Sequence, residues 1–184
     1  MNNELLEIVN QTTILGLILT NDLTWRKNTD HLVKKANFRM IILRNLIEFP
    51  VPIKNLVLIY SQFIRVILEF NSNVWFSSIT KEESSDLERV QRNACKLILQ
   101  NEYVGYQIAL EKLNLESLED RRNRLAKKFA QGCQNLEEMK DLFVQNTNQY
   151  NIRQQNTYNV KFASKPRLLN STVPTLQRML NSNK

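Results

Sequence analysis

The chain of 184 residues has the length of one ordinary domain and is long enough to bury a hydrophobic core. Its three glycines and four prolines are too few for an all-β protein with many tight turns, so the composition indicates helices. A formal net charge of +7 and a pI near 9.5 favour polyanionic partners, although net charge alone does not define a binding site.

A short β element is predicted near the N-terminus. Residues Thr13 to Thr20 form an apolar, β-branched run that ends at Asn21 and Asp22. This pattern indicates one buried strand followed by a turn. Because an isolated strand is barely stable in water, we expect it to join the edge of a larger structure, and its unpaired edge can recruit another chain.

Two helices are predicted next. The first runs from Asn28 to Glu48, before Pro50 and Pro52. Its inward face is predicted to carry Leu32, Ala36, Met40, Leu43 and Ile47. The second helix is predicted from Ile53 to about Phe76. It is apolar nearly all round, which is typical of a central helix surrounded by others, so we interpret it as the core of the domain.

A third helix is predicted from the capping box at Thr80 and Glu83 to about Leu99. Its apolar stripe consists of Leu87, Val90, Ala94, Leu97 and Ile98. On a different face lie three cations at helical spacing, Arg89, Arg92 and Lys96.

The C-terminal half is also predicted to be helical. A short helix from Tyr106 to Leu113 precedes a longer one that opens at Ser117, with inward residues Leu118, Leu125 and Phe129. The longer helix carries a second cationic row, Arg121, Arg124 and Lys128; with Arg122 and Lys127, we interpret it as the most basic segment of the chain. A short helical turn at 137–143, a mobile polar connector at 145–159 and a last helix with Leu176, Met179 and Leu180 complete the prediction.

The two cationic rows have two interpretations, and the pattern leaves both open. In one, the charges make ordinary helix-surface pairs, Glu88 with Arg92 and Asp120 with Arg124. In the other, they contact phosphates, since Arg89, Lys96, Arg121, Lys127 and Lys128 have no obvious acidic residue at helical spacing. The candidate nucleic-acid-binding residues are Arg89, Arg92, Lys96, Arg121, Arg124, Lys127 and Lys128.

The sequence carries no recognisable catalytic or metal motif. It has no adjacent pair of aspartates for two-metal chemistry and no glycine-rich phosphate loop. Cys95, Cys133 and the single histidine, His31, have no zinc-site spacing. We therefore expect no catalytic residue, metal or cofactor. A polar N-terminus without a secretory signal, and no long apolar run, predict an intracellular protein of the nucleus or cytoplasm with no membrane partner.

Several ordered motifs resemble one protein family. Residues 13–25 (TILGLILTNDLTW) and 31–36 (HLVKKA) resemble the "LGV…D..LTW…..V.KA" segment of jockey-like non-LTR (LINE-type) retrotransposon reverse transcriptases. Residues 63–70 (FIRVILEF) with 74–75 are similar to "SFIRSVLEY…VW", and 87–94 (LERVQRNA) to "LERVQRRA". Residues 115–122 (LESLEDRR) resemble "LESLEDRR", and 170–181 (NSTVPTLQRMLN) resemble "NSAIPYLTRLLN". The likeness is collinear over nearly the whole chain, with Asn28 and Thr172-Val173 as departures.

This resemblance implies the C-terminal, non-catalytic part of an RNA-directed DNA polymerase. Residues 1–25 would end the palm as a β element, 26–143 would form a mainly α, helical thumb-like domain, and 144–184 a polar connector with a short helix. The expected partners are an RNA/DNA duplex and the palm and fingers portion, which carries the catalytic aspartates. Two alternatives remain open: a truncated retroelement product that acts as a helical protein-interaction module, and a relic without function.

Overall fold

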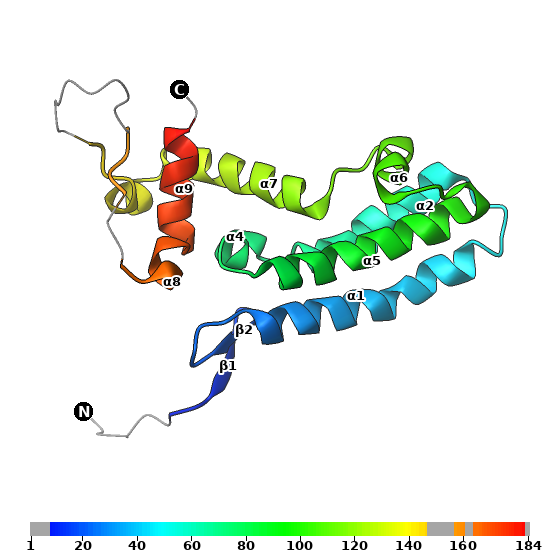
Figure 1. Cartoon of the computed structure of the whole chain (residues 1–184), viewed down its shortest axis with the longest axis horizontal. Coiled ribbons are helices and arrows are strands. Elements are labelled where there is room, and N and C mark those ends of the chain that lie inside the picture. Colours follow the sequence, from blue (N-terminus) through cyan, green and yellow to red (C-terminus); the bar gives the residue numbers. More distant parts are fainter. Residues whose placement is uncertain (1–7, 147–156, 161–163, 183–184) are drawn as a thin grey trace. The chain divides into compact units, whose positions relative to one another are not determined.

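The structure, a computed structural model, describes residues 8–146, 157–160 and 164–182. It is mainly helical with a short antiparallel β element near the N-terminus, as predicted (Figure 1). The chain divides into two compact units. The first consists of Met1–Leu68 and Ile79–Ile98, and the second of Glu69–Ser78 and Leu99–Lys184. These boundaries differ from the three ranges predicted as domains.

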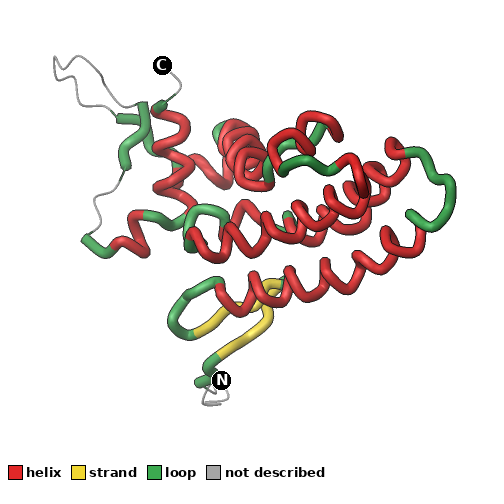
Figure 2. Tube along the Cα trace, turned by 45° about the vertical axis from the view of Figure 1, so that its right-hand side comes forward, coloured by secondary structure: helices red, strands yellow, loops and turns green. Residues whose placement is uncertain are grey.

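The β element is a hairpin, so the prediction of one strand from Thr13 to Thr20 is wrong. Strands β1 (Gln11–Ile14) and β2 (Leu17–Thr20) pair antiparallel, with Ile14 opposite Leu17. Leu15 and Gly16 connect them with φ angles of 48° and 80°. Two consecutive positive φ values suit a tight two-residue turn, and Gly16 adopts its value without steric cost. Figure 2 shows the two strands next to the start of the first helix.

Helix α1 (Arg26–Leu46) confirms the predicted helix and most of its inward face. Leu32, Ala36, Met40 and Leu43 are buried, and Ile47 is half-buried. The hairpin is tied to this helix because the backbone N–H of Ile18 donates to Asn28 Oδ1 at 3.2 Å.

The segment predicted as one helix from Ile53 to Phe76 is divided. Helices α2 (Ile53–Ile59), the π-helical η1 (Tyr60–Arg65) and α3 (Val66–Leu68) follow one another, and α4 (Ser72–Trp75) is separate. Asn71, with a φ of 49°, has the left-handed conformation just before α4. The segment is not buried all round either, because Leu58 and Phe63 are 56% and 51% exposed. Leu56, Tyr60, Ile64, Ile67 and Leu68 form its buried side.

Helix α5 (Lys81–Leu99) begins with the predicted capping box. The backbone N–H of Glu83 donates to Thr80 Oγ1 at 3.1 Å, and the N–H of Thr80 donates to Glu83 Oε2 at 2.6 Å. Leu87, Val90, Ala94 and Ile98 are buried as predicted, and Leu97 is half-buried. Within the first unit, the Tyr60 hydroxyl donates to Gln91 Oε1 of α5 at 2.7 Å, which satisfies two polar groups in the core.

The capping box leads to a stability prediction. Replacing Thr80 with Ala removes the acceptor for the Glu83 N–H, and we expect the free energy of unfolding to fall by about 1 kcal/mol. Urea denaturation followed by circular dichroism measures this change. The control Ser85→Ala, at an exposed position of the same helix, should leave stability within about 0.5 kcal/mol. Equal effects of the two substitutions would contradict a capping role.

The second unit contains the remaining elements. They are η2 (Gln100–Glu102), α6 (Tyr106–Leu113), α7 (Leu118–Cys133), η3 (Glu137–Leu142), α8 (Pro166–Leu169) and α9 (Thr172–Asn181). Its core is formed by Phe76, Ala126, Ala130, Cys133, Phe143, Leu176 and Leu180. The Thr172 hydroxyl donates to the Val74 carbonyl at 2.7 Å and thereby joins α9 to α4. Most of the predicted connector at 145–159 lies outside the described residues.

Candidate nucleic-acid interface

Helix α7 buries a different face from the one predicted. Its buried residues are Leu118, Arg122, Ala126, Ala130 and Cys133. Of the residues predicted to point inward, Leu125 is half-buried and Phe129 is 40% exposed, so the prediction is wrong for Phe129. The small alanines form the face that packs in the core, and the large Phe129 ring is left at the surface of the helix.

Arg122 is a core residue rather than part of a basic surface. Only 3% of the residue is exposed, and its guanidinium carbon lies 6.0 Å from the centroid of the Trp75 ring. A guanidinium at this distance over an indole gains a cation–π attraction. The predicted basic segment therefore has one fewer surface cation than its sequence indicates.

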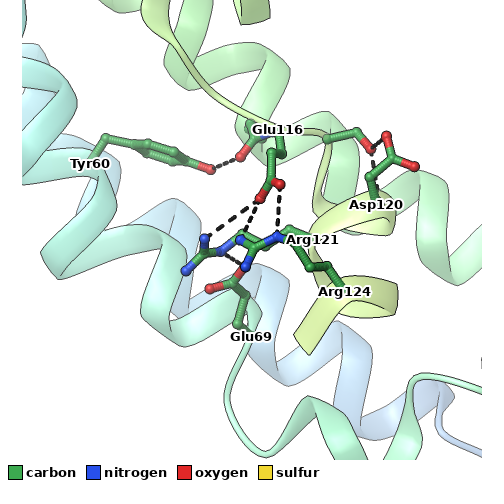
Figure 3. Close-up of polar contacts among 8 residues, drawn as sticks. Tyr60, Glu69, Glu116, Asp120, Arg121 and Arg124 are labelled. Atoms are coloured by element: carbon green, nitrogen blue, oxygen red, sulfur yellow. Dashed lines mark hydrogen bonds and ion pairs between the residues drawn. The ribbon is translucent and has the colours of Figure 1, made fainter. Parts of the chain in front are cut away.

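Two of the candidate phosphate contacts, Arg121 and Arg124, are held in an ion-pair cluster (Figure 3). Arg124 donates from Nε and Nη2 to the two oxygens of Glu116, at 2.8 and 2.7 Å. Arg121 Nε lies 2.6 Å from Glu69 Oε1 and its Nη1 lies 3.7 Å from Glu116 Oε2. The hydrogen bond that Arg124 donates to Glu116, together with the negative charge of that carboxylate, raises the pKa of Arg124. Both guanidinium groups thus already have carboxylate partners.

The predicted pairing of Asp120 with Arg124 is replaced by local capping. Ser117 Oγ accepts from the Asp120 backbone N–H at 3.0 Å, and the Ser117 hydroxyl donates to Asp120 Oδ2 at 2.6 Å. The acidic partner of Arg124 comes instead from Glu116, which precedes the helix. Spacing within the helix therefore identified the cation but not its partner.

Lys127 and Lys128 are the candidates on α7 that stay open to a ligand. Both residues are exposed, and the described part of the chain provides no ion pair for either. An ammonium group at the surface is a strongly hydrated point charge that can approach a phosphate without first leaving a carboxylate.

The row on α5 lies on an electrically neutral helix. Its four Lys or Arg residues are balanced by four acidic residues. Arg89, predicted to have no acidic residue at helical spacing, pairs with Asp86 three residues earlier at 3.0 Å, so that prediction is wrong. Lys96 is exposed and Arg92 is half-buried. This balance lowers the positive potential that the row could present to a polyanion.

Helix α1 is the most basic helix described, which corrects the prediction for α7. It holds six Lys or Arg residues against one Asp, whereas α7 holds five against two acidic residues. We name one exposed face of α1 the basic strip and define it as Lys27, His31, Lys34, Lys35 and Phe38. The high number of cations on α1 was visible in the sequence. It was overlooked because these cations are not spaced in one i, i+3, i+7 row.

The basic strip has little acidic competition. The only acidic residue of α1, Asp30, lies 3.1 Å from the Arg26 guanidinium. Arg26 also contacts Glu82 and Asp86 of α5, and these three carboxylates raise its pKa. Lys27 donates to the neutral Gln11 amide oxygen, while Lys34 and Lys35 have no ion pair among the described residues. The strip therefore combines exposed ammonium groups with Phe38, which is 78% exposed.

No metal site is evident among the described residues, and their two cysteines are buried. The described ranges contain no group of three or more His, Cys, Asp or Glu residues that could hold a metal ion. Cys95 and Cys133 are buried free thiols, and burial, with the nearby charge of Glu88 as a smaller cause, raises the pKa of Cys95 to about 12. Such a thiol stays protonated at neutral pH and is a poor nucleophile.

Within the described ranges, no helix is both long and apolar enough to cross a membrane. No protein-family model, no curated protein and no solved structure matches the chain.

Proposed function

We propose that this chain is the C-terminal, non-catalytic part of a non-LTR retrotransposon reverse transcriptase and that it binds nucleic acid. The proposed origin rests on the ordered motifs from residue 13 to residue 181, since several motifs in one order are more specific than any single motif. The proposed activity is binding, and polymerisation would need the aspartates of a palm.

The observation that carries the binding proposal is the set of exposed lysines that have no acidic partner among the described residues. In the first unit these are Lys34 and Lys35, with Lys27 beside them on α1; in the second they are Lys127 and Lys128 on α7. Lysines at such positions neutralise phosphates and release condensed counterions, which is the main source of sequence-independent affinity. Contacts of this kind position a duplex and do not read its bases.

Geometry on α1 also suits a nucleic-acid backbone. Lys27, His31, Lys34 and Phe38 recur at intervals of three and four residues and so share one face of the helix. From Lys27 to Phe38 the face extends about 16 Å along the axis, at ~1.5 Å per residue. That length is enough to follow several consecutive phosphates of one strand.

Fluorescence anisotropy with an RNA/DNA hybrid tests the proposed function. We expect saturable binding whose affinity falls by orders of magnitude between about 50 and 200 mM salt, because each phosphate contact contributes to the salt slope. A double-stranded DNA of the same length measures any preference for the hybrid. Absence of binding even at 50 mM salt would overturn the proposal.

A protein-interaction module is the second candidate, and exposed apolar side chains favour it. Leu58, Phe63 and Val66 are 56%, 51% and 45% exposed, and Ile14 of the hairpin is 52% exposed. Exposed apolar side chains and an unpaired strand edge are common where protein chains associate. Complexes of this kind should hardly weaken between 50 and 200 mM salt, which separates them from electrostatic binding to nucleic acid.

A further inference from the structure

A shallow cavity of about 500 Å³ that is widely open to solvent lies in the second unit, beside α4 and α7. Its walls include Asn71, Asn73, Leu125, Lys128 and Phe129. The volume is within the range of about 300–1,000 Å³ that is usual for small-molecule sites. Lys128 is one of the expected phosphate contacts, but the sequence motifs do not explain why it lies here beside two amides and an aromatic ring.

The cavity residues match the parts of a nucleotide. Lys128 is exposed and has no ion pair within the described ranges, so its ammonium can approach a phosphate. The Phe129 ring is 40% exposed, which leaves area on which a base can stack. Side-chain amides such as Asn71 and Asn73 offer donors and acceptors to the edge of a base.

The side chain of Asn73 is not anchored through its oxygen. Asn73 Oδ1 is buried and has no hydrogen-bond partner among the described residues. A buried amide oxygen normally has a partner, so its lack of one is unfavourable. Rotation of the side-chain amide would let Asn73 exchange this arrangement for a hydrogen bond to a ligand.

Glu69 also lines the cavity, and its charge would repel a phosphate if it were uncompensated. Its Oε1, however, is paired with Arg121 Nε (Figure 3) at 2.6 Å. Only 11% of the Glu69 side chain is exposed. The ion pair therefore neutralises this wall. Arg121, predicted as a phosphate contact, serves here to compensate Glu69.

We infer that this cavity binds one unpaired nucleotide of a nucleic-acid strand, with the base on Phe129, its edge at Asn71 and Asn73, and the phosphate at Lys128. This inference rests on the proposed function and adds to it a preference for unpaired over fully paired nucleic acid. A base inside a duplex has both faces stacked and both partners paired, so it cannot enter such a cavity.

The test compares a blunt RNA/DNA hybrid with the same hybrid extended by five unpaired nucleotides, by anisotropy at one fixed salt concentration. The chain should bind the extended hybrid about tenfold more tightly, as expected for one stacked base. Phe129→Ala and Asn73→Ala should each abolish this preference while the affinity for the blunt hybrid stays unchanged. Making the extension once of RNA and once of DNA shows whether the 2′-hydroxyl contributes; a preference for either supports the inference.

Phe49→Ala is the matched control, because Phe49 is a 64% exposed phenylalanine that does not line the cavity. It should retain the preference for the extension. Phe129→Leu, which keeps an apolar side chain and removes the ring, should lose the preference while preserving the helical circular dichroism. Equal affinity of the wild-type chain for blunt and extended hybrids would overturn the inference and leave salt-dependent binding intact. Failure to bind either hybrid at low salt would overturn the proposed function as well.

Discussion

Replacing Trp75 with Ala is expected to lower the free energy of unfolding by about 3–5 kcal/mol, the usual cost of removing a buried aromatic side chain. Trp75 has no exposed surface, and its Nε1 donates to the Phe70 carbonyl at 2.9 Å. Without the indole, the buried guanidinium of Arg122 also loses the ring beneath it. The substitution thus creates a cavity and weakens the environment of a buried charge at the same time.

Urea denaturation followed by far-ultraviolet circular dichroism measures this loss. Trp75 belongs to the second unit. If the two units unfold in separate transitions, only the transition of the second unit should move to lower urea concentration in Trp75→Ala. Phe49→Ala, at an exposed position, should change stability by no more than about 0.5 kcal/mol. A loss below about 1 kcal/mol for Trp75→Ala would contradict the burial of this ring.

A double-mutant cycle isolates the contact between Trp75 and Arg122. Arg122→Ala alone should destabilise the chain, because it removes a 3% exposed side chain that packs against the ring. If the two side chains interact as the 6.0 Å separation indicates, the double variant should be more stable than the sum of the single losses predicts, by about 0.5–2 kcal/mol.

Helices with local start signals were predictable from sequence. The Thr80 and Glu83 pair marks the beginning of α5, and Ser117 marks the beginning of α7; in both, the interacting groups lie within three residues. The inward face of α1 was also predictable because strong apolar periodicity runs through Leu32, Ala36, Met40 and Leu43.

The predictions are wrong where the local structure depends on residues distant in sequence or on the φ angles of a single turn. An unbroken apolar run hid the turn at Leu15 and Gly16, since only their positive φ angles separate the two strands. The buried face of α7 was missed because Arg122 is charged, and its burial depends on Trp75, 47 positions earlier. Phe129, a typical core residue, is instead on the rim of a cavity.

The candidate site was predictable only in part, because the ion-pair partners of two of its cations lie outside the helix that carries them. The sequence identifies every cation, but the partners of Arg121 and Arg124 are Glu69 and Glu116, which precede the helix and do not follow its spacing. Lys127 and Lys128 stay candidates because the part of the chain that the structure describes brings no carboxylate to them. On α1, counting charges over the whole helix, rather than searching for a regular row, would have identified the basic strip.

Neutralising the three lysines of the basic strip, Lys27, Lys34 and Lys35, by substitution with Gln is expected to weaken binding to an RNA/DNA hybrid by two to three orders of magnitude at about 0.1 M salt. Each phosphate contact contributes about 0.9 to the slope of log K against log salt, so three lost contacts should make the slope shallower by ~2.7. Glutamine keeps the helix propensity and much of the length of lysine, so helix α1 should persist.

The matched control removes three lysines elsewhere, Lys54, Lys81 and Lys165, with the same change in net charge. If affinity follows only the net charge of the chain, both triple variants should weaken binding equally, and the strip would have no special role. If the strip contacts the backbone, only its own variant should change the salt slope. Lys127→Gln with Lys128→Gln then asks whether α7 adds a second contact region: a further fall in slope of about 1.8 would mean that both units of the chain bind phosphates, whereas an unchanged slope would confine binding to α1.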